Sequence, residues 1–85
     1  MYCQYVRVTN SRNERLLLCV EPTGEQLWME PGVEYEARVC GPTFGAAELF
    51  IESDRLELYP WNDAEISVYR GETRVAGTRD HPSQP

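Results

Sequence analysis

The sequence predicts a small all-β domain, and three observations carry this prediction. Apolar and polar residues alternate along several segments, as side chains on the two faces of a half-buried strand do. Turn-forming residues recur about every 8–12 residues, a spacing typical of a β-sandwich or barrel. No window of about 11 or more residues shows the apolar stripe of an amphipathic helix. A chain of 85 residues is long enough for one such domain.

The N-terminal part of the chain contains three expected strands, at residues 3–9, 15–21 and 26–30. The first two are separated by the polar segment 10–14 (NSRNE), whose side chains readily hydrogen-bond to their own backbone and so favour a turn. The next turn is 21–24 (EPTG), because proline presets φ at its second position and glycine tolerates a positive φ.

The fourth expected strand, residues 33–41, follows a strong type II turn signal at 30–33 (EPGV), with proline and then glycine at the central positions. Its odd-numbered residues from Val33 to Val39 are apolar or aromatic, and the even-numbered residues between them are charged. This alternation predicts one buried face and one solvated face.

The C-terminal part of the chain continues the same pattern. After the loop 41–45 (GPTFG), strands are expected at residues 47–52, 55–59, 65–70 and 73–76. The last two are joined through 70–73 (RGET), where glycine at the first central position suits a type II′ hairpin turn.

We therefore predict about eight short, mainly antiparallel strands in two sheets packed face to face, in an up-and-down or partly Greek-key order. A small closed barrel is the alternative. Residues 1–76 form the single β domain, and residues 77–85, which lack apolar periodicity, are expected to be a flexible tail. The residues expected in the core are Val6, Val8, Leu16, Leu18, Val20, Leu27, Met29, Val33, Tyr35, Ala37, Val39, Leu49, Ile51, Leu56, Leu58, Ile66 and Val68.

The charge of the chain argues against two classes of partner. The net charge is −6, and the eight cations, all arginines, are scattered among fourteen acidic residues. Binding to nucleic acid needs basic residues gathered on one face, and an acidic surface also repels anionic lipid. We therefore expect no nucleic-acid partner and no membrane association.

The location expected from the sequence is the cytoplasm. The chain shows no signal-peptide pattern, and its longest apolar run, residues 16–20, is too short to span a membrane. The number of cysteines is odd, and the three, Cys3, Cys19 and Cys40, are widely spaced. Both features fit an intracellular protein.

Two turn-containing segments carry a resemblance to a group of proteins. Residues 18–25 (LCVEPTGE) and 29–33 (MEPGV) resemble small uncharacterised bacterial all-β proteins that have a Glu-Pro-x-Gly-Glu turn followed by a Pro-Gly turn. The resemblance implies an all-β fold and no activity.

The sequence offers little for catalysis or metal binding. A Cys–His pair or a Ser–His–Asp triad would have to use His81, the single histidine, which lies in the expected tail. Structural zinc favours closely spaced ligand pairs, whereas the cysteines are 16 and 21 residues apart. Three strands could still gather them with His81, but Cys19 and Cys40 are better interpreted as half-buried strand residues. We expect no cofactor and no metal.

Paired carboxylates occur as Glu34 with Glu36 and as Glu48 with Glu52. A glycosidase needs two carboxyl groups across a cleft that fits its substrate, and glutamates on a strand face are typically a solvated surface. We therefore expect a protein that is not an enzyme.

The most informative feature is a set of aromatic residues on faces assigned to solvent: Tyr5, Trp28, Phe50 and Tyr69, with Trp61 in a turn. Exposed aromatic residues beside arginine are typical anchors of protein interfaces. In a strongly coiled small sheet, however, both faces of some strands are covered, and the same side chains would simply pack within the chain. Both interpretations remain open at this point.

The leading hypothesis is a protein-binding module, for example a small acidic inhibitor or immunity-type protein that blocks a basic target. Its partner would be a foreign protein or a second copy of the chain. The alternative is a β-sandwich that binds a small ligand or carbohydrate through an aromatic platform on Trp28 or Trp61. In the leading hypothesis the anchors are Tyr5, Trp28, Phe50, Trp61 and Tyr69, and Glu34 and Glu36 steer the partner.

Overall fold

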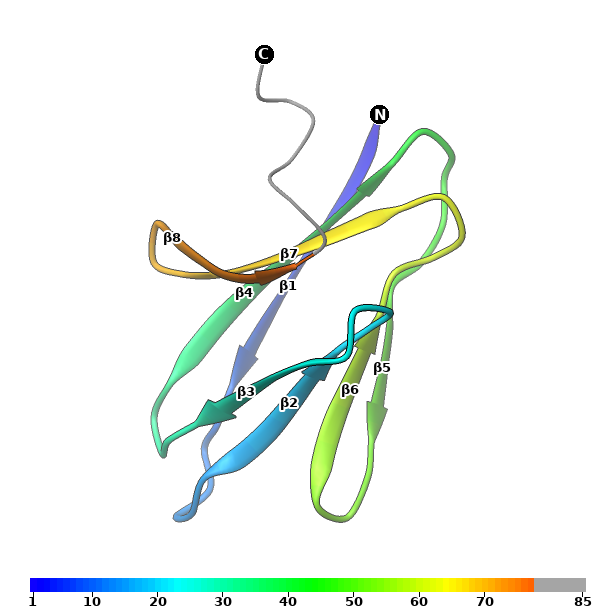
Figure 1. Ribbon diagram of the computed structural model, residues 1–85. Coiled ribbons are helices and arrows are strands. Elements are labelled where there is room, and N and C mark those ends of the chain that lie inside the picture. The colour runs from blue at the N-terminus through cyan, green and yellow to red at the C-terminus, as the bar shows by residue number, and fades with distance from the viewer. Residues whose placement is uncertain (78–85) are drawn as a thin grey trace.

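The computed structural model describes residues 1–77 and contains eight β-strands in two four-stranded sheets (Figure 1). The sheets are separate layers, so the fold is the predicted two-sheet arrangement and not a closed barrel. The expected tail, residues 77–85, lies outside the described residues apart from Gly77, which ends the last strand.

The first sheet has the spatial order β1-β4-β7-β8 and is antiparallel throughout. Its centre is β4, the segment with the clearest alternation in the sequence, and the burial of its residues alternates in the same way through most of its length. The strands are β1 (Tyr2–Thr9), β4 (Glu34–Gly41), β7 (Glu65–Arg70) and β8 (Thr73–Gly77).

The second sheet has the order β3-β2-β6-β5. Its two central strands, β2 and β6, run parallel, and the outer pairs are antiparallel. A parallel pair needs a long crossover connection, which here includes three strands. The strands are β2 (Leu16–Val20), β3 (Glu25–Met29), β5 (Glu48–Ile51) and β6 (Arg55–Tyr59).

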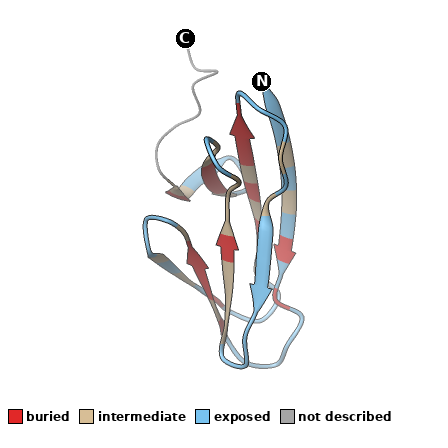
Figure 2. Ribbon diagram, turned by 90° about the vertical axis from the view of Figure 1, so that its right-hand side faces the viewer, coloured by how far each residue is buried: buried red, intermediate tan, exposed pale blue. Residues whose placement is uncertain are grey.

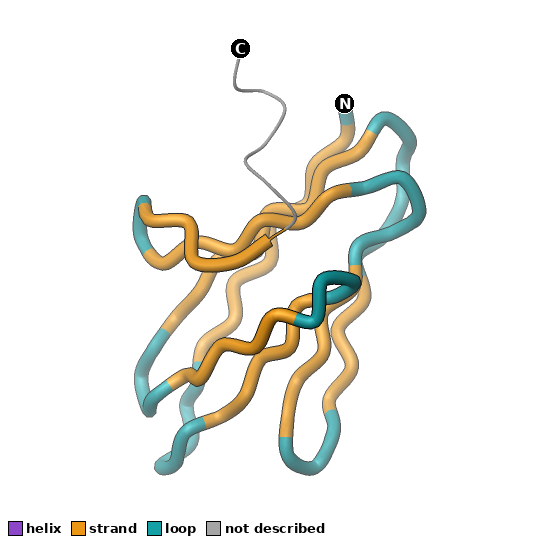
Figure 3. The backbone as a smooth tube through the Cα atoms, viewed as in Figure 1, coloured by secondary structure: helices purple, strands orange, loops and turns teal. Residues whose placement is uncertain are grey.

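The strands are joined by loops and turns (Figure 3), and two of the predicted glycine turns have the required backbone geometry. Gly32 has a φ of 85°, and the amide of Val33 donates a 3.0 Å hydrogen bond to the carbonyl of Glu30, as in a type II turn. Gly71 has a φ of 62° between β7 and β8, which agrees with the type II′ prediction. The Gly71 turn joins β7 and β8, which pair in the first sheet, whereas the Gly32 turn carries the chain from β3 in the second sheet to β4 in the first.

The core lies between the inner faces of the two sheets (Figure 2). Nearly all predicted core residues are buried or pack against buried ones. Two predictions are wrong, because Leu49 and Ile51 are 40% and 79% exposed. Both lie on β5, an edge strand. Their side chains point toward the inner face, but the opposite sheet does not cover this edge. The largest fully buried apolar side chains are Leu18, Met29, Leu58, Ile66, Val20, Val39 and Val68.

Candidate functional site

The residues singled out in the sequence occupy three separate places. Successive side chains along a strand point to opposite faces of the sheet. Val8, Ala37 and Val68 are buried, so the residues adjacent to them in the sequence point to the outer face of the first sheet. Tyr5, Glu34, Glu36 and Tyr69 lie on this outer face, Trp28 and Phe50 lie on the outer face of the second sheet, and Trp61 follows β6.

The outer face of the first sheet forms a ladder of aromatic and charged side chains, which we call the Tyr–Arg face. Strand pairing places Tyr5 opposite Arg38 and Arg7 opposite Glu36, and Glu36 is also opposite Tyr69 on the next strand. Residues directly opposite each other in an antiparallel pair are close enough for their side chains to interact. The members of the face are Tyr5, Arg7, Glu34, Glu36, Arg38 and Tyr69.

Arg38 is the centre of the Tyr–Arg face. Its guanidinium carbon lies 3.9 Å from the centre of the Tyr69 ring, and its Nε donates a 2.8 Å hydrogen bond to Glu36. This hydrogen bond raises the pKa of the Arg38 guanidinium above its ordinary value. Arginine is charged at physiological pH even without such a shift. Its side chain is 35% exposed, and Tyr5 beside it is 64% exposed. The face therefore presents a cation in a defined orientation next to an exposed phenol.

A second ion pair lies at the margin of the Tyr–Arg face. Arg7 Nε is 3.3 Å from Glu34, and the hydroxyl of Thr9 also donates a hydrogen bond to this carboxylate. The side chains of Arg7 and Glu34 are 69% and 50% exposed. Because water screens such pairs, their contribution to stability is about 0–1 kcal/mol. Both charges therefore remain accessible to a partner.

The two aromatic residues on the second sheet do not lie on the Tyr–Arg face. The guanidinium of Arg15 covers the Trp28 ring at 4.1 Å, and Phe50 meets Tyr59 edge-on at 5.3 Å. Trp28 and Phe50 are 49% and 45% exposed. They lie on opposite edge strands, β3 and β5, so this sheet does not gather them into one aromatic cluster.

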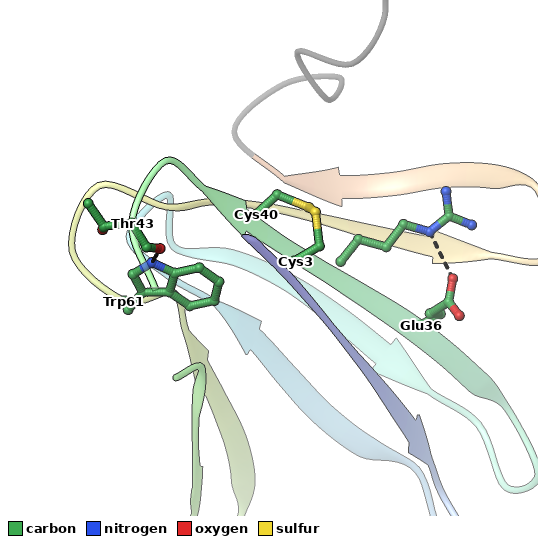
Figure 4. The surroundings of a disulfide bond; sticks show 6 residues. Cys3, Glu36, Cys40, Thr43 and Trp61 are labelled. Atoms are coloured by element: carbon green, nitrogen blue, oxygen red, sulfur yellow. Dashed lines mark hydrogen bonds and ion pairs between the residues drawn. A yellow bond between two sulfur atoms is a disulfide. The ribbon is translucent and has the colours of Figure 1, made fainter. Parts of the chain in front are cut away.

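The side chain of Trp61 packs against the 41–47 segment and the core of the same chain. Its Nε1 donates a 2.9 Å hydrogen bond to the carbonyl of Thr43 (Figure 4), and its ring lies directly against Gly45. It also packs against the hydrophobic core. We conclude that Trp61 holds the 41–47 segment against the end of the sandwich, and it is not part of the Tyr–Arg face.

The cysteines form a pair that the sequence analysis did not identify. Cys3 on β1 lies opposite Cys40 on β4, with Cα atoms 4.1 Å apart, and the two form a disulfide (Figure 4). Cys19, buried on the other sheet, has a free thiol. The fold therefore does not bring the three thiols together, and residues 1–77 contain no group of metal-ligating side chains that could hold an ion.

The disulfide bears on the expected location. Disulfides persist in oxidising compartments and are uncommon in the cytoplasm. The cytoplasmic location stays a prediction, and the Cys3–Cys40 bond counts against it. In the described part of the chain no helix is long and apolar enough to cross a membrane.

Comparison with known proteins finds no relative of this chain. No protein-family model matches the chain, and neither a curated protein nor a solved structure matches it. Functional inference therefore depends on the geometry of the surfaces described above.

Proposed function

We propose that this protein is a non-enzymatic protein-binding module that recognises its partner through the Tyr–Arg face. The observation that carries the proposal is the placement of Arg38, held between Glu36 and the Tyr69 ring beside the exposed Tyr5. Tyrosine and arginine are enriched among the residues that dominate binding energy at protein interfaces.

Preorganisation supports this assignment. A free arginine side chain loses rotamer freedom when a partner immobilises it, which costs about 0.5–1.5 kcal/mol. The contacts of Arg38 with Glu36 and Tyr69 already restrict it in the unbound protein. A carboxylate or a main-chain carbonyl of the partner would therefore meet a guanidinium that needs little further ordering.

The overall charge indicates what kind of partner approaches fastest. The net charge of −6 attracts a basic protein over long range, whereas the Tyr–Arg face itself carries both signs of charge. A small acidic inhibitor or immunity-type protein that blocks a basic toxin or enzyme has this combination. We propose this as the biological form of the module.

Affinity capture from a lysate of the source organism tests the proposal. The bait is the wild-type protein, compared with Tyr5→Ala and Arg38→Ala, and captured proteins are identified by mass spectrometry. One stoichiometric protein is expected with the wild type, and it should be lost with both variants. Arg12→Ala, in the exposed turn after β1, and Trp28→Ala, on the other sheet, are the matched charge and aromatic controls. Equal capture by all five baits would remove the Tyr–Arg face from the interaction.

The carbohydrate-binding alternative depends on Trp28, the more exposed of the two tryptophans. Arg15 covers one side of its ring, so a sugar would have to displace this guanidinium or stack on the opposite side. Titration of tryptophan fluorescence with a panel of glycans tests this alternative, because stacking on Trp28 changes its emission. A flat response across the panel would eliminate it.

A further inference from the structure

The edge strand β5 is exposed along its whole length (Figure 2), and the three residues that follow Glu48 in it are apolar. In the second sheet it pairs with β6 on one side, and no other strand of the described chain pairs with it. Leu49 lies opposite Leu58, which is fully buried, and Ile51 lies opposite Leu56. Leu49 and Ile51 therefore point to the inner side of the sheet, yet they are 40% and 79% exposed. The inner face of the sandwich is open along this edge.

The register shows which backbone groups of β5 are available. The amide of Glu52 donates a 2.8 Å hydrogen bond to the carbonyl of Arg55, which marks these two residues as a hydrogen-bonded pair. Hydrogen-bonded and non-hydrogen-bonded pairs alternate along an antiparallel ladder. Phe50 is therefore hydrogen-bonded to β6, whereas Leu49 and Ile51 direct their N–H and C=O groups away from β6, toward the free edge. Such a row of groups is a template for a further strand.

The charges beside this edge argue against pairing with a second copy of the chain. Glu48, Phe50 and Glu52 share the outer side of the strand, because they alternate with Leu49 and Ile51. An antiparallel pair of β5 strands centred on Phe50 would place Glu48 of each copy directly opposite Glu52 of the other. Like charges in opposite positions are destabilising. Within residues 1–77 no ion pair neutralises either carboxylate.

We propose that β5 binds an extended, basic segment of a partner protein as an added antiparallel strand. The segment carries apolar residues opposite Leu49 and Ile51, where they complete the open margin of the core. On its other side it carries Lys or Arg opposite Glu48 and Glu52, with an aromatic residue opposite Phe50. This surface is on the other sheet from the Tyr–Arg face, so the proposal goes beyond the proposed function and does not depend on it.

A synthetic peptide that contains Lys-Val-Tyr-Ile-Lys provides the test. In antiparallel alignment its lysines lie opposite Glu52 and Glu48, and its valine and isoleucine lie opposite Ile51 and Leu49. Addition of the peptide to the ¹⁵N-labelled full chain should shift the amide resonances of Leu49 and Ile51 and slow their hydrogen exchange. The amides of Tyr5 and Arg38 on the other sheet should not change.

Control peptides and a protein variant distinguish the addition of a strand from nonspecific electrostatic attraction. A peptide with glutamate in place of both lysines should bind at least about tenfold more weakly, because two attractive cross-strand pairs become repulsive. The Glu48→Lys/Glu52→Lys variant should reverse this preference, and both substitutions are at exposed positions. Methylation of the peptide nitrogens of valine and isoleucine should abolish binding, because these groups would pair with Leu49 and Ile51.

Several results would overturn the proposal. One is the absence of any shift at millimolar peptide, and another is equal binding of the lysine and glutamate peptides. Protection of the Leu49 and Ile51 amides in the free monomer would show that the chain already covers this edge. A dimer detected by light scattering and lost in an Ile51→Lys variant would identify a second copy as the occupant.

Discussion

The side chain of Asn10, the first residue after β1, donates a 2.8 Å hydrogen bond to the carbonyl of Met29, the last residue of β3. This bond joins a strand of the first sheet to a strand of the second. The same amide group donates to the carbonyl of Glu14, and its oxygen accepts a hydrogen bond from the amide of Arg12. Asn10 is completely buried, so each of its side-chain polar groups has a partner inside the protein.

Replacement of Asn10 by aspartate should destabilise the protein by about 3 kcal/mol or more. The substitution keeps the shape but removes two donors, which leaves the carbonyl oxygens of Met29 and Glu14 facing a buried carboxylate. Urea unfolding at neutral pH measures the loss. Asn62→Asp, at an exposed turn position, is the matched control and should change the free energy of unfolding by less than about 0.5 kcal/mol. Similar losses in the two variants would contradict the role given to Asn10.

Reduction of the Cys3–Cys40 disulfide should lower the free energy of unfolding by about 3–4 kcal/mol, as the chain-entropy model gives for a loop of this length. The bond links residues 37 positions apart, and its loss increases the freedom of the unfolded chain. Urea unfolding with and without a phosphine reductant measures the difference.

Thiol counting and variants check this assignment. Alkylation in denaturant should label one thiol, that of Cys19, without reductant, and all three thiols after reduction. The Cys3→Ala/Cys40→Ala variant should not respond to the reductant, whereas Cys19→Ala should respond as the wild type does. Three reactive thiols in protein that was never reduced would show that the disulfide does not form.

Local patterns in the sequence predict the strands, because each strand and turn depends on a few adjacent residues. The alternation in 33–41 and the Pro31-Gly32 turn are examples. The order of strands in the sheets depends on contacts between distant segments, which no local pattern encodes. The pairing of Cys3 with Cys40 therefore could not be predicted, since it requires the register of β1 on β4.

The same distinction applies to the candidate surfaces. Alternation along each strand predicts that Tyr5, Glu36 and Tyr69 each point to solvent, whereas the pairing of their strands, which gathers them on one face, is seen only in the structure. The sequence places Arg38 on the same polar side of its strand as Glu36, but it does not identify Arg38 as the centre of the Tyr–Arg face. Alternation also assigns Leu49 to an inner face, but whether a second sheet covers that position depends on where the edge of the sandwich lies.

Replacement of Gly45 by alanine should displace the Trp61 ring and destabilise the protein by about 2 kcal/mol. A β-carbon at residue 45 would occupy the space of the indole ring, and a displaced ring loses both core packing and its hydrogen bond to Thr43. In a Trp28→Phe background the remaining emission comes from Trp61, and it should shift to longer wavelength. Trp61→Phe, which keeps an aromatic ring but lacks the donor, should cost about 0.5–1.5 kcal/mol, because the carbonyl of Thr43 is exposed and can bond to water instead. Unchanged Trp61 emission in Gly45→Ala would contradict this packing.

Cys19 should make the stability of the protein depend on pH in the alkaline range. Burial raises the pKa of its thiol above the ordinary value of 9.0, and this effect exceeds the opposing effect of the nearby Arg55. The folded state therefore holds the proton more tightly than the unfolded state does. The stability linked to this group is complete below the pKa of the unfolded chain, and it is lost as pH rises from there through the pKa of the folded protein.

Unfolding in urea at a series of pH values from about 8 to 10, around the thiol pKa, measures this dependence. The free energy of unfolding should fall more steeply with pH in the wild type than in Cys19→Ala, because only the wild type has a thiol that ionises more easily when unfolded. Tyr59, whose pKa is also raised by burial, contributes equally to both proteins and cancels in the difference. Parallel pH profiles for the two proteins would show that the Cys19 thiol has the same pKa in both states.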